Sequence, residues 1–306
     1  MYKLTEDGKF IVEDYNWKTS FSNFFPGIAG RYGVPMWAYY VTRAQCVVSA
    51  GVRDKNRQIM EFRSFNKALN AVGSEGFRTF VKTGGAVREP FARSADRSAR
   101  QTLTVSSGEL ELRDEDPATG LVTEVLYYQL PGSPYPAMVR RLKLRNTGRR
   151  ALRVELLDGL PKILPHGMDL HCVQTIARHV EGMMEAADLD GSPLFRLKQS
   201  PADVEKVERV EGGNFYLSFP SAGRVSYLVD PEVVFGEAEV YDRPWNFMKE
   251  PLPALLRRPQ VRQNRTPSAM TAASFELRPG REYTLHSLLG YAETDALLRR
   301  ARRDAG

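Results

Sequence analysis

The sequence predicts an all-β protein built as one large antiparallel β-sandwich, with one internal helix and a second helix at the C-terminus. Three observations support this class. Apolar and polar residues alternate at period two over much of the 306-residue chain, as they do in half-buried antiparallel strands. Turn signals recur about every ten residues, the spacing of a β-sandwich. The regular helical crossovers that an α/β fold would need are missing.

Two segments show the alternation most clearly. Residues 103–112 alternate on both sides of a Ser-Ser-Gly turn and predict a β-hairpin. Residues 141–156 alternate on both sides of Asn146-Thr147-Gly148, and the basic residues between the leucines are expected to face solvent. Near the end of the chain, Pro279-Gly280 predicts a type II turn, because proline fixes φ and glycine accepts a positive φ.

Two helices interrupt this pattern. An internal helix is predicted to start near Asp169, and its apolar face would comprise Leu170, Val173, Ile176, Ala177 and Val180. A second helix is predicted after Thr294-Asp295, with Leu297, Leu298 and Ala301 as a stripe. Because so short a helix is marginal alone, we expect it to dock or fray, and its loss to cost little stability. The segments 86–100 and 242–268 are predicted to be long loops.

Composition limits the cellular setting and the partners. The net charge is +6 and the pI is about 9.3, but the arginines are spread along strand patterns, as on the solvent faces of strands. We therefore expect no nucleic-acid partner. The N-terminus lacks an apolar signal region and no apolar run is long enough to span a membrane. These features predict a cytoplasmic protein without a membrane partner.

The search for catalytic chemistry finds no convincing motif. The sequence lacks GxSxG and the glycine-rich phosphate loop. His171 and His179 are eight residues apart on the predicted internal helix, but no further ligands stand at matched spacing, so no metal or cofactor is expected. Asp158 follows an apolar strand and is predicted to be a strand-end turn residue. No catalytic residue is predicted in this chain.

The most unusual segment is SNFFPGIAGRYGVPMWAYY, residues 22–40. Glycines beside aromatic residues let the backbone approach a ligand closely and expose ring faces, on which sugars stack. An ordinary aromatic core with glycine turns would give the same composition. The candidate substrate-binding residues are Arg31 and Tyr32, which are expected to point outward between the glycines, together with Trp37.

These residues carry a resemblance to a known group. SNFFPGIAGRYGVPMWAYYV, GVRDKNRQIMEF and GFRTFVK resemble the amino-terminal region of cellobiose-phosphorylase-like glycoside phosphorylases of bacteria, in glycoside hydrolase family 94 and its relatives in families 149 and 161. Later segments fit the same region in order: RRLKLRNTGRRALRVELLDGLPKILPHG, YLVDPEVVFG and FELRPGREYTLHSLLGYAET. The resemblance spans nearly the whole chain.

The resemblance implies a galactose-mutarotase-like supersandwich over residues 1–291 and, over residues 292–306, the start of a helical linker to an (α/α)6 catalytic barrel. In such enzymes a barrel aspartate acts as general acid while inorganic phosphate, the co-substrate, attacks the anomeric carbon. The expected role of this chain is therefore non-catalytic: it would support a barrel domain or barrel chain, contribute to a homodimer, and border the cleft for β-linked gluco-oligosaccharides.

Two alternatives remain open at this point. A stand-alone carbohydrate-binding or regulatory sandwich would expose aromatic residues in a row. A mutarotase-like sugar epimerase would need two histidines and a carboxylate in one cleft, and His166 and His171 with Asp158 are the candidates for that set.

Overall fold

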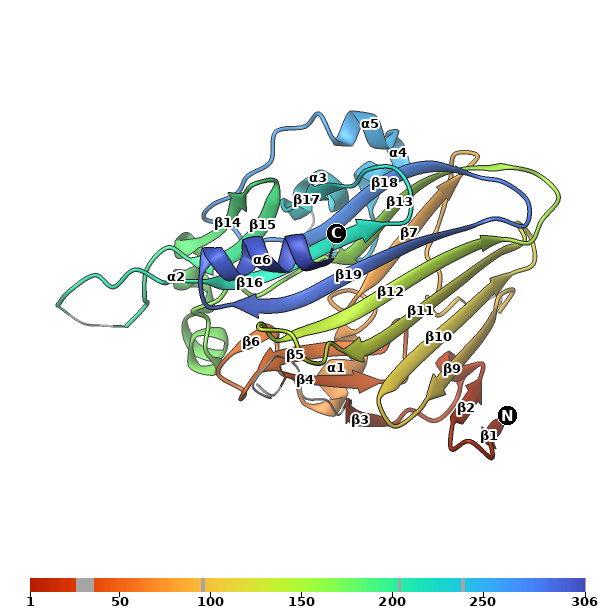
Figure 1. Cartoon of the computed structure of the whole chain (residues 1–306), viewed down its shortest axis with the longest axis horizontal. Helices are drawn as coiled ribbons and strands as arrows, with labels where there is room; N and C mark the ends of the chain where they lie inside the picture. The colour runs from red at the N-terminus through yellow and green to blue at the C-terminus, as the bar shows by residue number, and fades with distance from the viewer. Residues whose placement is uncertain (26–35, 95–96, 203–204, 238–239, 306) are drawn as a thin grey trace.

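The computed structural model describes residues 1–25, 36–94, 97–202, 205–237 and 240–305. In this part of the chain, the strands form three antiparallel sheets, of ten, five and four strands (Figure 1). The predicted all-β class and the large antiparallel sandwich are confirmed.

The ten-stranded sheet runs across the whole molecule. Its order in space is β1-β2-β9-β10-β11-β12-β19-β16-β15-β14, and every pair is antiparallel. Residues 100–146 form four strands, β9 to β12, that are adjacent both in the chain and in the sheet. The first two, β9 and β10, form the hairpin predicted around residues 106–108. The strands span Tyr2–Leu4 (β1), Phe10–Glu13 (β2), Arg100–Val105 (β9), Glu109–Asp116 (β10), Leu121–Gln129 (β11), Ala137–Asn146 (β12), Met184–Leu189 (β14), Ser192–Leu197 (β15), Gly213–Pro220 (β16) and Glu282–Ala292 (β19).

The two smaller sheets pack on the inner face of the large one, and a single apolar core includes side chains from all three. The five-stranded sheet has the order β17-β18-β13-β7-β8, and the four-stranded sheet is β3-β4-β5-β6. Their strands span Ser22–Phe25 (β3), Met36–Val41 (β4), Val47–Val52 (β5), Gln58–Met60 (β6), Arg78–Thr83 (β7), Ala86–Arg88 (β8), Leu152–Leu160 (β13), Ser226–Leu228 (β17) and Ala269–Leu277 (β18).

Both predicted turns near the sheet ends prove to be crossovers between sheets. The turn at residues 146–148 leads from β12 in the large sheet to β13 in the five-stranded sheet. Asn146 is fully buried there, and its Nδ2 donates to the carbonyls of Arg150 and Leu277 at 2.8 Å each. The Pro279-Gly280 turn leads back from β18 to β19, with Gly280 at φ 72° as the type II geometry requires.

The internal helix is confirmed between residues 170 and 183. Asp169 caps it, because its Oδ1 accepts a hydrogen bond from the Cys172 amide at 2.7 Å. The helix comprises a π-helical turn (Cys172–Ile176), α2 (Ala177–Val180) and a 3-10 turn (Glu181–Met183).

Four further helices escaped the sequence reading because each is too short to show a helical period. Two of them fall in the segment 242–268, so the long loop predicted there is wrong in part. They are α1 (Phe65–Ala71), α3 (Pro231–Phe235), α4 (Trp245–Lys249) and α5 (Leu252–Leu255). The last three cover the outer face of the five-stranded sheet through a second apolar cluster. In the segment 86–100, the described residues between β8 and β9, 89–94 and 97–99, belong to no helix or strand.

The C-terminal helix α6 (Asp295–Ala305) docks on the outer face of the large sheet, over β16 and β19 (Figure 1). Leu298 is 1% exposed and Ala301 is fully buried, in a cluster with apolar residues of β12, β16 and β19. Removing α6 would uncover that cluster, so the docked helix leads us to expect that its loss costs more stability than the sequence alone suggested. The division of the chain at residue 292 stays a prediction.

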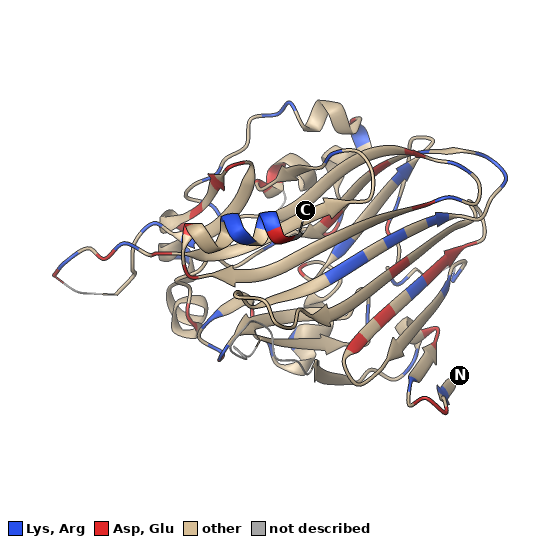
Figure 2. Cartoon of the chain, in the orientation of Figure 1, with Lys and Arg blue, Asp and Glu red and all other residues tan. Residues whose placement is uncertain are grey.

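Charged side chains gather on β10 and β12 of this sheet (Figure 2). Lys and Arg follow β12 while Asp and Glu dominate β10, and ion pairs connect these strands through β11: Glu124 pairs with Arg113 and Lys143. Arg141, Lys143 and Arg145 thus face outward, as predicted. None of the helices in the described ranges is long and apolar enough to cross a membrane.

The docking of α6 can be tested with Leu298→Ala. Loss of this buried side chain should lower the free energy of unfolding by about 2–5 kcal/mol, measured by urea denaturation. Arg300→Ala, an exposed position on the same helix, is the matched control and should change it by less than about 0.5 kcal/mol. Equal, small effects of both variants would contradict docking in solution.

Candidate functional site

Of the three predicted substrate-binding residues, Arg31 and Tyr32 lie outside the described residues. Trp37 lies in β4 and is half-buried. Its Nε1 donates to the Asp54 carbonyl at 3.0 Å, and its ring lies so close to Gly51 that a Cβ there would come within 2.5 Å of it. Position 51 must therefore be glycine for the Trp37 ring to lie where it does, because any larger side chain would clash with it.

Trp37 belongs to an aromatic cluster on the face of the four-stranded sheet opposite the main core. We use "aromatic cluster" for Phe24, Trp37, Tyr39 and Phe62. The rings of Trp37 and Phe62 meet edge to face at 5.6 Å, and Phe24 contacts Tyr39 at 5.1 Å. Phe24 is 48% exposed. The aromatic cluster is thus neither wholly core nor wholly surface, because Phe24 is exposed to solvent and packs on the buried Tyr39.

The histidine set considered for epimerase chemistry is not assembled. Both carboxylate oxygens of Asp158 are bound by Arg140 and Thr79. The ring of His166 packs on Tyr291 at 4.6 Å, and His171 is exposed on the internal helix beside Thr175. Burial, then the charge of Arg57, lowers the pKa of His166 to about 4. Among the described residues, no cluster of His, Cys, Asp and Glu is arranged to hold a metal ion.

Asp158 instead forms a buried ion pair with Arg140 that joins two sheets. Both side chains are almost completely buried, and Arg140 also donates to Gln45, Thr79 and Tyr127. Burial alone would lower the pKa of Arg140, but the adjacent Asp158 raises it above its usual value. The strand-end turn predicted for Asp158 is wrong, because β13 continues to Leu160.

The sequence contains a signal for this pair. Arg140 has the same parity in β12 as the core residues Leu142 and Leu144, and Asp158 has the same parity in β13 as Val154 and Leu156. In a strand, residues two apart share a face. Two opposite charges at inward positions of strands in facing sheets therefore predict a buried pair. The signal is hard to recognise in the sequence, because Arg140 lies in a run of basic residues whose other members face outward.

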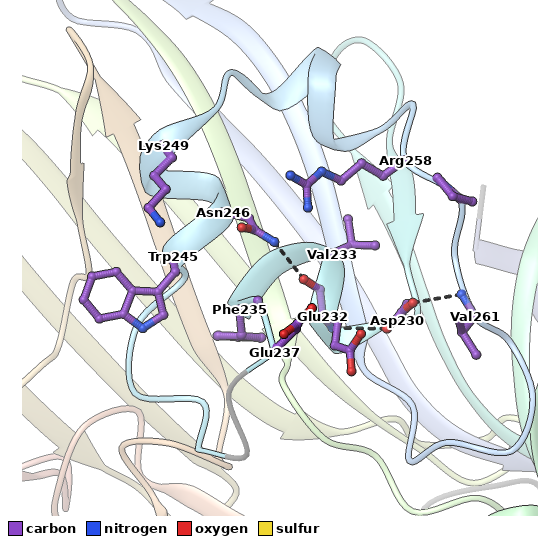
Figure 3. A pocket seen from close by; sticks show the side chains of 12 residues that line it. Asp230, Glu232, Val233, Phe235, Glu237, Trp245, Asn246, Lys249, Arg258 and Val261 are labelled. Atoms are coloured by element: carbon purple, nitrogen blue, oxygen red, sulfur yellow. Dashed lines mark hydrogen bonds between the residues drawn. The ribbon is translucent and has the colours of Figure 1, made fainter.

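The pocket that sequence reasoning missed lies outside the sandwich, between α3 and α4 (Figure 3). Its volume is about 620 Å³. Trp245 and Lys249 of α4 stand on one side and Arg258 and Val261 on the other, with the carboxylates of α3 and its C-terminal turn between them. We call it the α3–α4 pocket.

Local sequence explains how the pocket forms. Asp230 caps α3, because its Oδ1 accepts from the Glu232 amide at 3.1 Å, and Pro231 occupies the first turn. The other oxygen, Oδ2, accepts from the Val261 amide at 2.8 Å and so anchors the far wall. Asn246 donates to the Glu232 carbonyl at 2.9 Å and joins the two helices. An Asp-Pro pair is a helix-start signal that was available in the sequence.

The pocket combines an exposed indole with polar groups of both kinds. Trp245 is 38% exposed. Glu237 and Lys249 are exposed and make no ion pair with any described residue, whereas Glu232 and Arg258 are paired with Arg265 and Glu250. The pocket thus offers a ring surface, a free acceptor and a free donor. Such a set suits a neutral ligand rich in hydroxyl groups.

Comparison with known proteins gives no family. No family model matches the sequence, and no curated protein matches it. Among solved structures, a polysaccharide lyase aligns with 88% of this chain at 11% identity and a TM-score of 0.42, and a putative kojibiose phosphorylase from the human microbiome with 93% at 8% and 0.38. The chain spans only 34% and 27% of the length of these two proteins.

Two shorter proteins align over 99% of their own length. One is a putative aldose 1-epimerase from Escherichia coli K12, with 9% identity, 89% of this chain covered and a TM-score of 0.37. The other is a galactose mutarotase related enzyme from Lactobacillus acidophilus, with 8% identity, 90% covered and a TM-score of 0.39.

The structural role of the Arg140–Asp158 pair can be tested by a double-mutant cycle. Arg140→Met and Asp158→Leu should each cost about 3–5 kcal/mol, because each leaves a buried charge unpaired. The double variant should lose clearly less than the sum of both. Arg278→Met, in the exposed pair with Glu276, is the control, with an expected loss below about 1 kcal/mol. Strictly additive losses in the cycle would refute the coupling.

Proposed function

We propose that this chain is a carbohydrate-binding β-sandwich that binds sugars through the α3–α4 pocket and contributes no catalytic group. The observation that carries the proposal is the exposed indole of Trp245 beside the free polar groups of Glu237 and Lys249. A pyranose ring has apolar C–H faces and a rim of hydroxyls. It can stack on the indole while its hydroxyls bond to the carboxylate and the ammonium group.

The size of the pocket fits such a ligand. Small-molecule sites usually measure about 300–1,000 Å³, and the α3–α4 pocket lies within this range. Polar side chains make up much of its wall, which disfavours a wholly apolar ligand.

The finer proposal follows from the sequence resemblance. We propose that the chain serves a cytoplasmic inverting glycoside phosphorylase that cleaves β-linked gluco-oligosaccharides with inorganic phosphate. The barrel domain or a barrel chain would supply the general acid and the phosphate site, and the sandwich would support that barrel and a homodimer contact. Arg31, Tyr32 and Trp37 would then contact substrate at the edge of the cleft, with the aromatic cluster as their base.

Sugar binding can be measured by titration calorimetry with cellobiose and longer β-linked gluco-oligosaccharides. Trp245→Ala should weaken binding about tenfold, as for an anchoring aromatic residue, and should leave the melting temperature nearly unchanged. Met248→Ala, an exposed neighbour on α4, is the matched control and should bind normally. If Trp37→Ala weakens binding while Trp245→Ala does not, the aromatic cluster is the site. No binding of any of these sugars would overturn the proposed function.

The absence of a catalytic role can be tested separately. The pure chain is incubated with the same oligosaccharides and inorganic phosphate, and glucose 1-phosphate is assayed. We expect no enzyme-dependent release, because no catalytic residue is assigned to this chain. Steady release proportional to protein concentration would show that the sandwich itself is an enzyme.

A further inference from the structure

A second pocket, of about 390 Å³, lies where four segments of the chain meet. These are the 3-10 turn Tyr15–Trp17 and the chain after it, the turn between β4 and β5, the C-terminal end of α1, and the chain after β8. The pocket shares no residue with the α3–α4 pocket. Its wall includes Arg43 and Arg93, which give it an unusual charge balance.

Arg43 is half-buried, and no carboxylate of the described residues pairs with it. Its guanidinium donates to the carbonyls of Tyr15, Lys18 and Thr42 at 3.3, 3.1 and 2.7 Å. These bonds fix the position of the group but leave its full positive charge in place. Burial, followed by the charge of Arg93, lowers the pKa of Arg43, as expected where positive charge is uncompensated.

Arg93, on the same pocket wall, and Arg97 make no ion pair with any residue that the structure describes. The guanidinium carbons of Arg93 and Arg97 lie 4.4 and 4.1 Å from the centroid of the Trp17 ring. Stacking on an indole stabilises each cation by about 0.5–1 kcal/mol at an exposed site. Like charges on one ring also repel each other. The indole therefore holds in place two guanidinium groups whose mutual repulsion an anion would relieve.

Glu89, the acidic side chain among the described residues of the wall, cannot provide this compensation. Both carboxylate oxygens of Glu89 accept from Arg78 at 2.6 Å, so its charge is already paired. Ser20 and Asn70 also line the pocket, and the side chain of neither makes a hydrogen bond with a described residue. The pocket thus holds excess positive charge together with free neutral donors.

From this arrangement we infer that the pocket binds an oxyanion carried by a monosaccharide-sized molecule, either a phosphate ester or a carboxylate. Arg93 would bind the oxyanion as a charged donor, Arg43 would supply positive potential from the pocket wall, and Ser20 and Asn70 would bond the neutral part of the ligand. Charge-assisted bonds of this kind are about twice as strong as neutral ones. The inference does not depend on the α3–α4 pocket.

The test uses calorimetry with four probes: glucose 6-phosphate, glucuronate, inorganic phosphate and glucose. We expect at least one of the two charged sugars to bind, glucose to bind at this site much more weakly, and the affinity to fall with added salt. The preferred charged sugar identifies the oxyanion as phosphate or carboxylate. Binding of inorganic phosphate as tight as that of both charged sugars would overturn the sugar-sized class, because the neutral part would then contribute nothing.

Variants assign the site. Arg93→Gln should weaken binding of the preferred probe about tenfold, the loss expected when one charge-assisted contact is removed. The control is Arg145→Gln at an exposed position of β12, which removes the same charge elsewhere. This variant should bind the preferred probe normally. Asn70→Ala provides a second variant that leaves every arginine in place, and it should weaken the sugar probes but not inorganic phosphate. Failure of all three anions to bind, or equal binding by Arg93→Gln and the unmodified chain, would overturn the inference. Trp245→Ala should have no effect here.

Discussion

The buried ion pair between Arg140 and Asp158 is the constraint on which the architecture depends. It joins the middle of β12 in the ten-stranded sheet to β13 in the five-stranded sheet, inside a mainly apolar core. An apolar contact tolerates sliding by a residue, whereas a charged pair does not, because any shift leaves a buried charge unpaired at a cost of several kcal/mol. Thr79 and Gln45 extend the network to β7 and to the turn before β5. The pair thus sets how all three sheets lie on one another.

Two crossovers support the same register from the ends of the strands. The chain passes from the large sheet to the five-stranded sheet at residues 146–148 and returns at residues 279–280. Asn146 connects both passages through hydrogen bonds to Arg150, Leu277 and Gly280. Helices cover apolar patches on the outer faces of the sheets: α6 on the large sheet, α3–α5 on the five-stranded sheet and α1 on part of the four-stranded sheet.

This arrangement explains why the candidate sites lie outside the sandwich. The core between the sheets is filled, so concave surfaces form where short helices and loops pack on outer faces and strand ends. The α3–α4 pocket offers an indole with one free acid and one free base, a neutral balance that suits sugars. The pocket lined by Arg43 and Arg93 carries positive charge that no described carboxylate pairs, and this suits an oxyanion. We therefore propose two sites of different chemistry on one chain.

The sequence by itself determined the β class, the hairpin at residues 103–112, the cap of the internal helix at Asp169 and the turn at Pro279-Gly280, because each depends on local period or local backbone preference. It also singled out Trp37, although as one aromatic residue among several. Only the tertiary structure decided the partner of Asp158, the burial of Leu298 and both pockets. These depend on contacts between segments far apart in the chain, such as Asp230 with Val261, and the helices that form the larger pocket are too short to leave a period in the sequence.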